Sequence, residues 1–408
     1  MQSLKKAIFL FLLCYIFLYT NSTQYITTFL FQPIWNFAVP WFAALVGETE
    51  NVQSIASGSG DTWFDLYSMY FFAVVSVIFA IVVSIIDYKR PNYNHLHKWF
   101  LILIRYFVAY QMISYGYAKI FYLQFGPPTI SGMNTLLGDK SPMGLLWAFM
   151  GFSKTYCIFT GVAEFVGGVL LFSRKTTLLG AIITLGVMTN VMMLNYCFDV
   201  PVKFFSTHMV VFSLIIIGFW GKNVIDFFFR GKAFEPVKIA DVVPQKWQKI
   251  KFYLKWAVLI IYITNSAYTL NGYAQQYKNQ TPAVAFHGLY EVGQFSLYRD
   301  GGLMEHPPAE KVWKELDIRK DGRTVFKRQK GNPYYNNTEI DTVNQEITFF
   351  KMKDDSIGTK YQYKMFTDSI TLNGRYENDS LAVILKERKP FLLTSRKFNW
   401  VQQHPFHR

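Results

Sequence analysis

The chain has 408 residues, of which 51% are apolar and 18% aromatic, and its formal net charge is +14. Nearly all of the long apolar runs lie before about residue 270, and this uneven distribution predicts a membrane part joined to a soluble part. The excess positive charge lies mostly in short loops between apolar runs, which argues against a nucleic-acid partner and is typical of multi-pass membrane proteins instead.

A helix needs about 20 mainly apolar residues to cross a bilayer. On this basis we predict about seven spans, at 4–22, 66–86, 99–123, 156–172, 177–197, 206–220 and 253–270. A cleaved signal peptide is the alternative for the first segment, but its small-residue cleavage pattern is poor, so an uncleaved span is favoured. The apolar stretch 29–46 is interrupted by Pro33 and Pro40, so we predict an interfacial or re-entrant helix there.

The lysines and arginines of the loops are distributed asymmetrically. With the N-terminus inside, the inner loops 1–6, 87–98, 173–176 and 221–252 hold most of them, whereas the outer loops before residue 270 hold only Lys140, Lys154 and Lys203. The positive-inside rule therefore predicts a protein of the bacterial inner (cytoplasmic) membrane, with a cytoplasmic N-terminus and a periplasmic C-terminal domain.

The chain from about residue 281 alternates between apolar and polar residues, and turn sequences separate the alternating segments. These segments are 291–298, 324–329, 345–352, 360–366, 369–376, 380–387 and 390–400. They predict an antiparallel β-domain, either a small barrel or a sandwich. The expected divisions are 1–98 with an outer loop at 21–65, a helical core at 99–220, a basic inner loop and last span at 221–270, and the β-domain at 281–408.

Ionisable side chains inside the predicted spans are the main candidates for function, because they are costly in hydrocarbon and usually face a bundle interior or a wet cavity. Arg105, Tyr115 and Lys119 share one face of the third span, and Glu164 lies near the middle of the fourth. The rise of 1.5 Å per residue places Glu164 close in depth to Lys119 and about 15 Å from Arg105. We therefore expect Glu164 to pair with Lys119, and Arg105 to extend toward the inner interface.

Further polar residues lie where the fifth and sixth spans meet the outer surface, namely Asn195, Asp199, Lys203 and His208. Together with the Lys119–Glu164 pair they predict a polar funnel that opens outward. Two interpretations remain open, a structural network of ion pairs and a site for a ligand or a proton. Ser59 and Asp61 in the outer loop are a second candidate, as part of an anion site, although a flexible turn or a helix cap is the more usual role of such a run.

The sequence contains no recognisable catalytic motif. A P-loop, a dinucleotide-binding glycine motif, an HExxH motif and a Ser/His/Asp arrangement are all missing, so the catalytic residues are unknown and the enzyme question stays open. Cys14, Cys157 and Cys197 lie in or beside apolar segments without metal-ligand spacing. We interpret them as packing residues and predict no metal site.

The residues of the predicted core resemble a known family. Arg105, Gly116 and Lys119, followed by GVAEFVGGVLLFSRKTTLLGA (161–181), are similar to the DoxX family of small membrane proteins over roughly residues 99–220. The strings SGSGDT, KIFYLQFGPP, SPMGLLWAFMG, MLNYCFDVPVK and RKFNWVQQHPFHR resemble extended DoxX-like proteins of Bacteroidota that carry the same kind of tail. Because DoxX relatives include a subunit of a thiosulfate:quinone oxidoreductase and membrane partners of redox enzymes, the resemblance implies a redox-associated role with a quinone as candidate ligand. It transfers no catalytic residue.

The sequence thus leaves three functional hypotheses. The leading one is a redox-associated membrane subunit that binds a quinone-like or lipid-like ligand, with a tail that recruits a membrane or periplasmic partner or gates the site. The alternative is a non-catalytic scaffold for envelope assembly or export, in which the charges are structural. A weaker third hypothesis is a membrane enzyme that uses Lys119 or His208 as a base.

Overall fold

The structure, a computed structural model, consists of two compact units. It describes residues 2–23, 25–48, 52–54, 60–90, 92–234, 244–279, 285–319, 321–351, 354–388, 391–396, 401–402 and 404. The first unit, here called the helical unit, comprises Met1–Pro127 and Lys140–Leu270. The second, here called the barrel unit, comprises Pro128–Asp139 and Asn271–Arg408.

Every predicted span coincides with a helix. In chain order the helices are α1 (Gln2–Thr23), α2 (Tyr25–Leu45), α3 (Trp63–Ile86), α4 (Asn94–Ile120), α6 (Pro142–Phe152), α7 (Lys154–Phe172), α8 (Thr177–Cys197), α9 (Lys203–Gly218), α10 (Gly221–Arg230) and α11 (Gln248–Asn279), which begins after the short 3-10 helix Gln245–Trp247. Within the described residues, four helices are long and apolar enough to cross a membrane, namely α1, α3, α7 and α8. This composition indicates association with a membrane.

The expected count of seven spans is not confirmed. Helices α9 and α10 reach the required length and apolarity only together, and they are bent by 80° relative to each other. Helices α4 and α11 are long enough to cross a membrane, but neither is among the four helices that are also apolar enough. The physical reason for α4 is its content of Lys98, Arg105, Gln111 and Lys119, which lowers its mean hydropathy.

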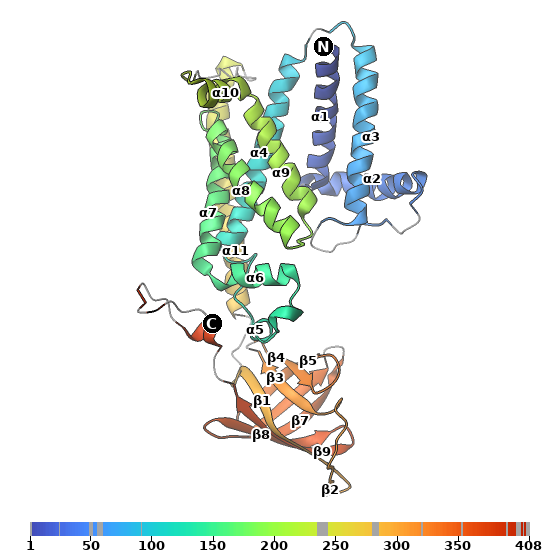
Figure 1. Cartoon of the computed structure of the whole chain (residues 1–408), viewed down its shortest axis with the longest axis vertical. Helices are drawn as coiled ribbons and strands as arrows, with labels where there is room; N and C mark the ends of the chain where they lie inside the picture. The colour runs from blue at the N-terminus through green and yellow to red at the C-terminus, as the bar shows by residue number, and fades with distance from the viewer. Residues whose placement is uncertain are drawn as a thin grey trace. The chain divides into compact units, whose positions relative to one another are not determined.

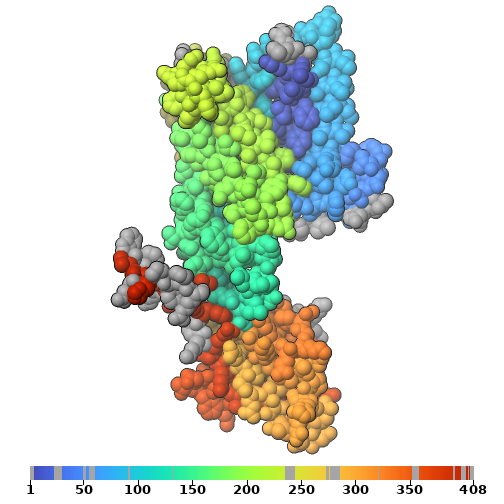
Figure 2. All heavy atoms as spheres, viewed as in Figure 1, coloured from blue at the N-terminus to red at the C-terminus, as the bar shows by residue number. Residues whose placement is uncertain are grey.

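Helices α1, α2 and α3 form one block. α1 and α3 run side by side, and α2 lies across their ends, with its far end protruding beyond α3 (Figures 1 and 2). α2 is continuous through Pro33 and Pro40. It is not among the described helices that are long and apolar enough to cross a membrane, and its interfacial or re-entrant placement stays a prediction. Its Trp35 ring packs edge-on against Phe72 of α3, with the ring centroids 5.1 Å apart.

Helix α4 is the centre of the remaining bundle. It packs closely against α7 and also contacts α9 and α1. On a further side it meets α11, where Ile113 and Tyr117 pack around Leu259 and the Ser114 and Tyr262 hydroxyls lie 2.6 Å apart. Helices α7, α8 and α9 pack in succession. This arrangement buries Arg105, Gln111 and Lys119 of α4 among its neighbours.

The barrel unit is built around a closed antiparallel sheet (Figure 1). Its strands are β1 (Gly288–Arg299), β2 (Gly302–Leu303), β3 (Trp313–Ile318), β4 (Arg323–Arg328), β5 (Tyr334–Asp341), β6 (Glu346–Lys351), β7 (Asp354–Met365), β8 (Ser369–Tyr376) and β9 (Asp379–Glu387). The order is β2-β1-β3-β4-β5-β6-β7-β8-β9, and β1 also pairs with β9. The ring therefore contains eight strands, with the two-residue β2 beside β1. Of the two predicted architectures, the structure shows the barrel.

Aromatic side chains fill the barrel interior. The ring of Trp313 contacts those of Phe326, Phe349, Tyr361 and Tyr376. A short segment from between α4 and α6 also belongs to this unit and contains α5 (Ile130–Met133) and a 3-10 helix (Leu137–Asp139). Although the sequence places this segment in the helical core, its Asn134 amide donates to Glu315 of β3 and accepts from Arg388.

One predicted strand is wrong and three strands were missed. In the segment 390–400, the described residues Leu392–Ser395 form the short helix α12, because the ring is already closed at β9 and offers no edge for another strand. The missed strands are β3, β5 and the two-residue β2. Charged or polar residues make up half of β3 and most of β5, and this obscures the apolar alternation.

Candidate functional site

Lys119 and Glu164 form an ion pair inside the helical unit. The Lys119 Nζ on α4 donates to both carboxylate oxygens of Glu164 on α7, at 2.6 Å and 2.7 Å. The two residues are 5% and 2% exposed. The predicted pairing is therefore confirmed. The two charges compensate each other, and two of the three N–H donors of the ammonium point at the carboxylate.

Glycines bring the two helices close enough for this contact. A Cβ on Gly116 would lie 2.8 Å from the Gly161 carbonyl oxygen, and a Cβ on Gly168 would lie 2.8 Å from Cγ1 of Ile113. Any side chain at these positions would push α4 and α7 apart. Small residues at a helix interface allow such close approach in membrane proteins. The glycines thus bring Lys119 within hydrogen-bonding reach of Glu164.

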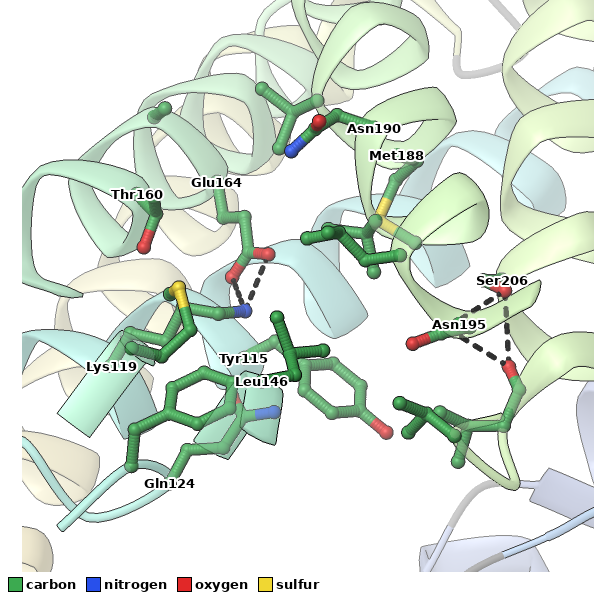
Figure 3. Close-up of a pocket in the computed structure, with 18 of the residues that line it drawn as sticks. Tyr115, Lys119, Gln124, Leu146, Thr160, Glu164, Met188, Asn190, Asn195 and Ser206 are labelled. Carbon is green, nitrogen blue, oxygen red and sulfur yellow. Dashed lines mark hydrogen bonds and ion pairs between the residues drawn. The ribbon is translucent and has the colours of Figure 1, made fainter. Parts of the chain in front are cut away.

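The ion pair faces a cavity of about 430 Å³ between α4, α6, α7, α8 and α9. Figure 3 shows the Lys119 and Glu164 side chains meeting at its wall. The lining is mainly apolar and aromatic, and includes Met112, Phe125, Leu146, Trp147, Phe149, Met150, Tyr156, Phe159, Met188, Leu194, Phe205 and Met209. A volume of this size lies within the range of about 300–1,000 Å³ that is usual for small-molecule sites.

A few amides and hydroxyls interrupt this apolar lining. The amide nitrogen of Asn195 donates to Ser206 Oγ at 3.0 Å, and in Figure 3 its oxygen points away from Ser206 toward the cavity. The Oε1 atom of Gln124 is buried and has no hydrogen-bond partner within the described chain. A buried acceptor without a partner loses the free energy of its hydration. Both amides therefore offer hydrogen-bonding capacity to a molecule in the cavity.

Tyr115 lies on the same face of α4, as predicted, and lines the cavity. The Lys119 Nζ lies 5.9 Å from the centroid of its ring, at the limit for a cation–π contact. Of the predicted site residues, the structure thus gathers Tyr115, Lys119, Glu164 and Asn195 around one cavity.

Asp199, Lys203 and Asp61 form a separate group that does not line the cavity. Lys203 Nζ lies 2.8 Å from Asp199 Oδ1 and 3.9 Å from Asp61 Oδ2. The Asp61 carboxylate accepts from the backbone N–H groups of Lys203 and Phe204 at 2.7 Å and 3.0 Å. Asp61 therefore caps the N-terminus of α9, a helix distant in sequence, whereas the helix that directly follows this loop, α3, is capped by Thr62. Ser59 lies outside the described residues.

His208 packs against α1 and does not join the funnel expected from the sequence. Its imidazole stacks on Tyr19 with the ring centroids 3.8 Å apart, and its Nε2 lies 2.9 Å from the Tyr15 hydroxyl. Its Nδ1 lies 2.7 Å from the Phe204 carbonyl oxygen. Both ring nitrogens are therefore used in holding α9 to α1 and in satisfying the backbone of α9.

Arg105 is also remote from the cavity. It is only 3% exposed, its guanidinium donates to Thr177 Oγ1 at 3.4 Å, and it lies over the ring of Tyr106. The guanidinium is buried by the start of α8 and does not extend to solvent as expected. Fourteen residues of helix separate it from Lys119, about 21 Å along α4.

The described residues offer no grouping of three or more His, Cys, Asp or Glu side chains suited to a metal ion. Cys157 is buried, Cys14 is half-buried and Cys197 is exposed, and all three are free thiols. Sequence reasoning missed Gln124, Thr160 and Asn190, which also line the cavity. Gln124 follows the end of α4, and uncharged polar residues in the other two helices gave no signal comparable to a charge.

Comparison with known proteins gives one informative match. A segment of 113 residues, 28% of this chain and 71% of the relative, is 35% identical to the uncharacterized protein YwoB of Bacillus subtilis (strain 168). No protein-family model matches the sequence. No solved structure matches it either.

Proposed function

The chain belongs to the same family as the uncharacterized protein YwoB of Bacillus subtilis (strain 168), and we propose that it is a multi-pass membrane protein whose cavity binds a quinone-like or lipid-like ligand. Since the description of the relative names no activity, the proposal rests on the cavity. The observation that carries it is a buried ion pair facing an apolar space of ligand size.

A buried ion pair alone is weak support for a structural role. Removing two charges from water costs free energy that their attraction does not always offset, and apolar residues of similar volume often stabilise as well or better. Ionisable residues within membrane helices therefore commonly mark functional sites. Here the pair borders a cavity, and the amides of Asn195 and Gln124 lie in the same lining.

The lining fits an amphipathic molecule. Lys119, Glu164, Asn195 and Gln124 supply donors and acceptors for a polar head. The aromatic residues, among them Trp147, supply flat apolar surfaces for a ring or a chain. A quinone combines carbonyl acceptors with an apolar ring and tail, and the resemblance to the DoxX family favours it. We accordingly propose a redox-associated membrane subunit, in which the residues bind and orient the ligand.

We further propose that α4 and α11 complete a set of seven spans with α1, α3, α7, α8 and α9. This is supported by the burial of Arg105, Gln111 and Lys119, because their polar groups are shielded from lipid by neighbouring helices. α11 packs against α4 through Leu259. The Lys/Arg asymmetry of the loops favours a bacterial inner membrane and a periplasmic barrel that recruits a partner or gates the site.

The test is to purify the full chain in a mild detergent and identify its bound small molecules by mass spectrometry. The parent protein is compared with a Lys119→Met/Glu164→Gln double variant, which removes both charges of the cavity without leaving one unpaired. The matched control is Asp87→Asn/Arg90→Met, which removes an ion pair whose side chains are 35% and 57% exposed.

We expect a quinone or another amphipathic molecule with the parent and the control, and its loss from the double variant. A stable double variant that retains the same ligand would overturn the assignment of the ion pair. A parent that carries no small molecule but holds a protein partner in constant stoichiometry would favour the scaffold alternative instead.

A further inference from the structure

Helices α7 and α8 both contribute residues to the cavity lining, and some of these residues also lie at the surface of the bundle. These helices pack tightly near their connection, where a Cβ on Gly167 would lie 2.8 Å from Thr184 Oγ1 and a Cβ on Gly180 would lie 2.8 Å from the Leu171 nitrogen. Farther along α8, a Cβ on Gly186 would meet no described atom within 4 Å, so this position borders open space.

Residues of both helices line the cavity and are accessible from outside at the same time. Gly186 and Asn190 of α8 belong to the lining and to the exposed surface. On α7, the half-buried Thr160 and Ala163 also line the cavity. Figure 3 shows Thr160 and Glu164 on one side of the cavity and Asn190 on another. We call the opening bounded by Thr160, Ala163, Gly186 and Asn190 the lateral gap.

The lateral gap lies at the depth of hydrocarbon. Both α7 and α8 are apolar and long enough to cross a membrane. Gly186 is nine residues from the start of α8, about 14 Å along the axis, which is near the middle of a bilayer core about 30 Å thick. Exposed apolar side chains flank the gap, including Phe159, Val162 and Ile182. A molecule passing through it would therefore come from the acyl-chain region.

The charge of the lining restricts what that molecule is. Lys119 and Glu164 are the charged residues among those that line the cavity, and they neutralise each other at hydrogen-bonding distance. A charged ligand would add an uncompensated charge to an apolar enclosure, which is strongly unfavourable. An uncharged head that only exchanges hydrogen bonds with these groups avoids that cost.

We propose that an uncharged, lipid-soluble molecule enters the cavity from the bilayer through the lateral gap between α7 and α8. This inference rests on the proposed ligand-binding function and adds to it the route and the charge class of the ligand. The apolar tail lies in the gap, and the polar head reaches Lys119, Glu164 and the amides.

The test uses the full-length protein in phosphatidylcholine vesicles and two photoreactive probes. One is a long-chain alcohol that carries a diazirine, and the other is an alkyl sulfonate of the same length, which stays ionised. After illumination, mass spectrometry maps the labels on peptides of α6, whose Leu146 and Met150 line the cavity. Unlabelled alcohol serves as competitor.

Gly186→Phe places a large side chain at the gap without a Cβ clash, and Gly218→Phe is its matched control. Gly218 likewise has no described atom within 4 Å of an added Cβ, and it does not line the cavity. Asn190→Trp is a second obstruction at an exposed position, in case Gly186→Phe does not fold. Melting temperatures establish that each variant is intact.

We expect the alcohol to label α6 in the parent and in Gly218→Phe, with labelling reduced by about tenfold or more in Gly186→Phe and Asn190→Trp, equivalent to about 1.4 kcal/mol. The sulfonate should label α6 weakly throughout. Unchanged labelling in both folded obstruction variants would overturn the lateral route while leaving the ligand site intact. Equal labelling by the sulfonate would overturn the uncharged class. A parent in which competitor-sensitive labelling of α6 is missing would overturn the route and the proposed function together.

Discussion

Gly116 of α4 and Gly161 of α7 lie against each other's backbone. A Cβ on Gly161 would come within 2.7 Å of the Gly116 carbonyl oxygen and 2.8 Å of the Lys119 Cβ. Real Cβ atoms do not approach other atoms so closely, so the helices can keep this spacing only while both positions are glycine. The Lys119–Glu164 ion pair depends on the same spacing.

Replacing Gly161 by alanine should destabilise the helical unit. Overpacking of this kind typically costs about 1–3 kcal/mol, which exceeds the gain of about 0.5–1 kcal/mol from the better helix propensity of alanine. The melting temperature in detergent should fall. Gly186→Ala is the control, and it should be neutral or stabilising because the position has open space. Equal melting temperatures for Gly161→Ala and Gly186→Ala would contradict the close packing.

Replacing Glu164 by glutamine should destabilise the protein more strongly. The substitution leaves the Lys119 ammonium buried without its counter-charge, and breaking one side of a buried pair costs about 3–5 kcal/mol. Adding Lys119→Met should restore part of the melting temperature, because both charges are then gone. A double variant that is no more stable than Glu164→Gln would mean that the two charges do not act as a pair. Ligand retention separates the roles, since a purely structural pair predicts that the rescued protein still binds.

Acid should weaken the barrel unit at Asp379. This residue is 1% exposed, and its carboxylate accepts from the Arg299 Nε and Nη2 at 2.8 Å and 3.1 Å. The hydrogen bonds and charge of Arg299 hold the pKa of Asp379 below the ordinary value of 3.8. Because the folded pKa is depressed, the stabilisation is present above the unfolded pKa and is lost as pH falls through the folded value. Hydrogen-exchange protection of β9, corrected for intrinsic rates, should decrease below about pH 4.

Asp379→Asn should lower this protection at neutral pH and reduce its acid dependence. Asp317→Asn provides the contrast, since burial raises the pKa of Asp317. The charged form of Asp317 is disfavoured in the folded barrel, so protonation of this residue favours folding. Removing it should therefore steepen the loss of protection in acid. A pH profile unaffected by Asp379→Asn would show that other groups control the acid response.

A reporter that is active only in the periplasm should be active when fused after Arg408 and inactive when fused near Lys238. The physical reason is the concentration of Lys and Arg in loops on one side of the proposed seven spans. A reporter active only in the cytoplasm should give the complementary result at both positions. The reversed pattern would invert the proposed topology and place the barrel in the cytoplasm.

Positions along a helix axis could be predicted from the sequence better than positions around it. The fixed rise per residue was sufficient to match Lys119 with Glu164 in depth, and the structure confirms that contact. The same reasoning placed His208 beside Asn195. However, His208 lies roughly 200° around α9 from Ser206, so it faces α1 while Ser206 faces the cavity. The direction that each side of α9 faces is set by packing between helices, and this packing cannot be derived from a single sequence.

The lateral gap also could not be predicted from the sequence. Gly167, Gly180 and Gly186 are identical residues in similar apolar surroundings, yet two of them sit in tight contacts and one borders open space. In the tail, alternation correctly located β1, β4, β6, β7, β8 and β9. β3 and β5 were missed because charged or polar residues make up half of the first and most of the second, and β2 is too short, at two residues, to show an alternation.

Closure of the barrel has a consequence for the order of its assembly. The seam between β1 and β9 joins Tyr290 to Glu387 and Tyr298 to Ser380, so the first and last strands of the ring hydrogen-bond directly. A growing chain cannot complete the ring until Glu387 has been synthesised, and before then the sheet has two unpaired edges open to other chains. Contacts between strands so far apart in sequence form slowly. A premature stop between β8 and β9 would therefore leave an open sheet with two unpaired edges and prone to aggregate, even though eight of the nine strands of the sheet were already made.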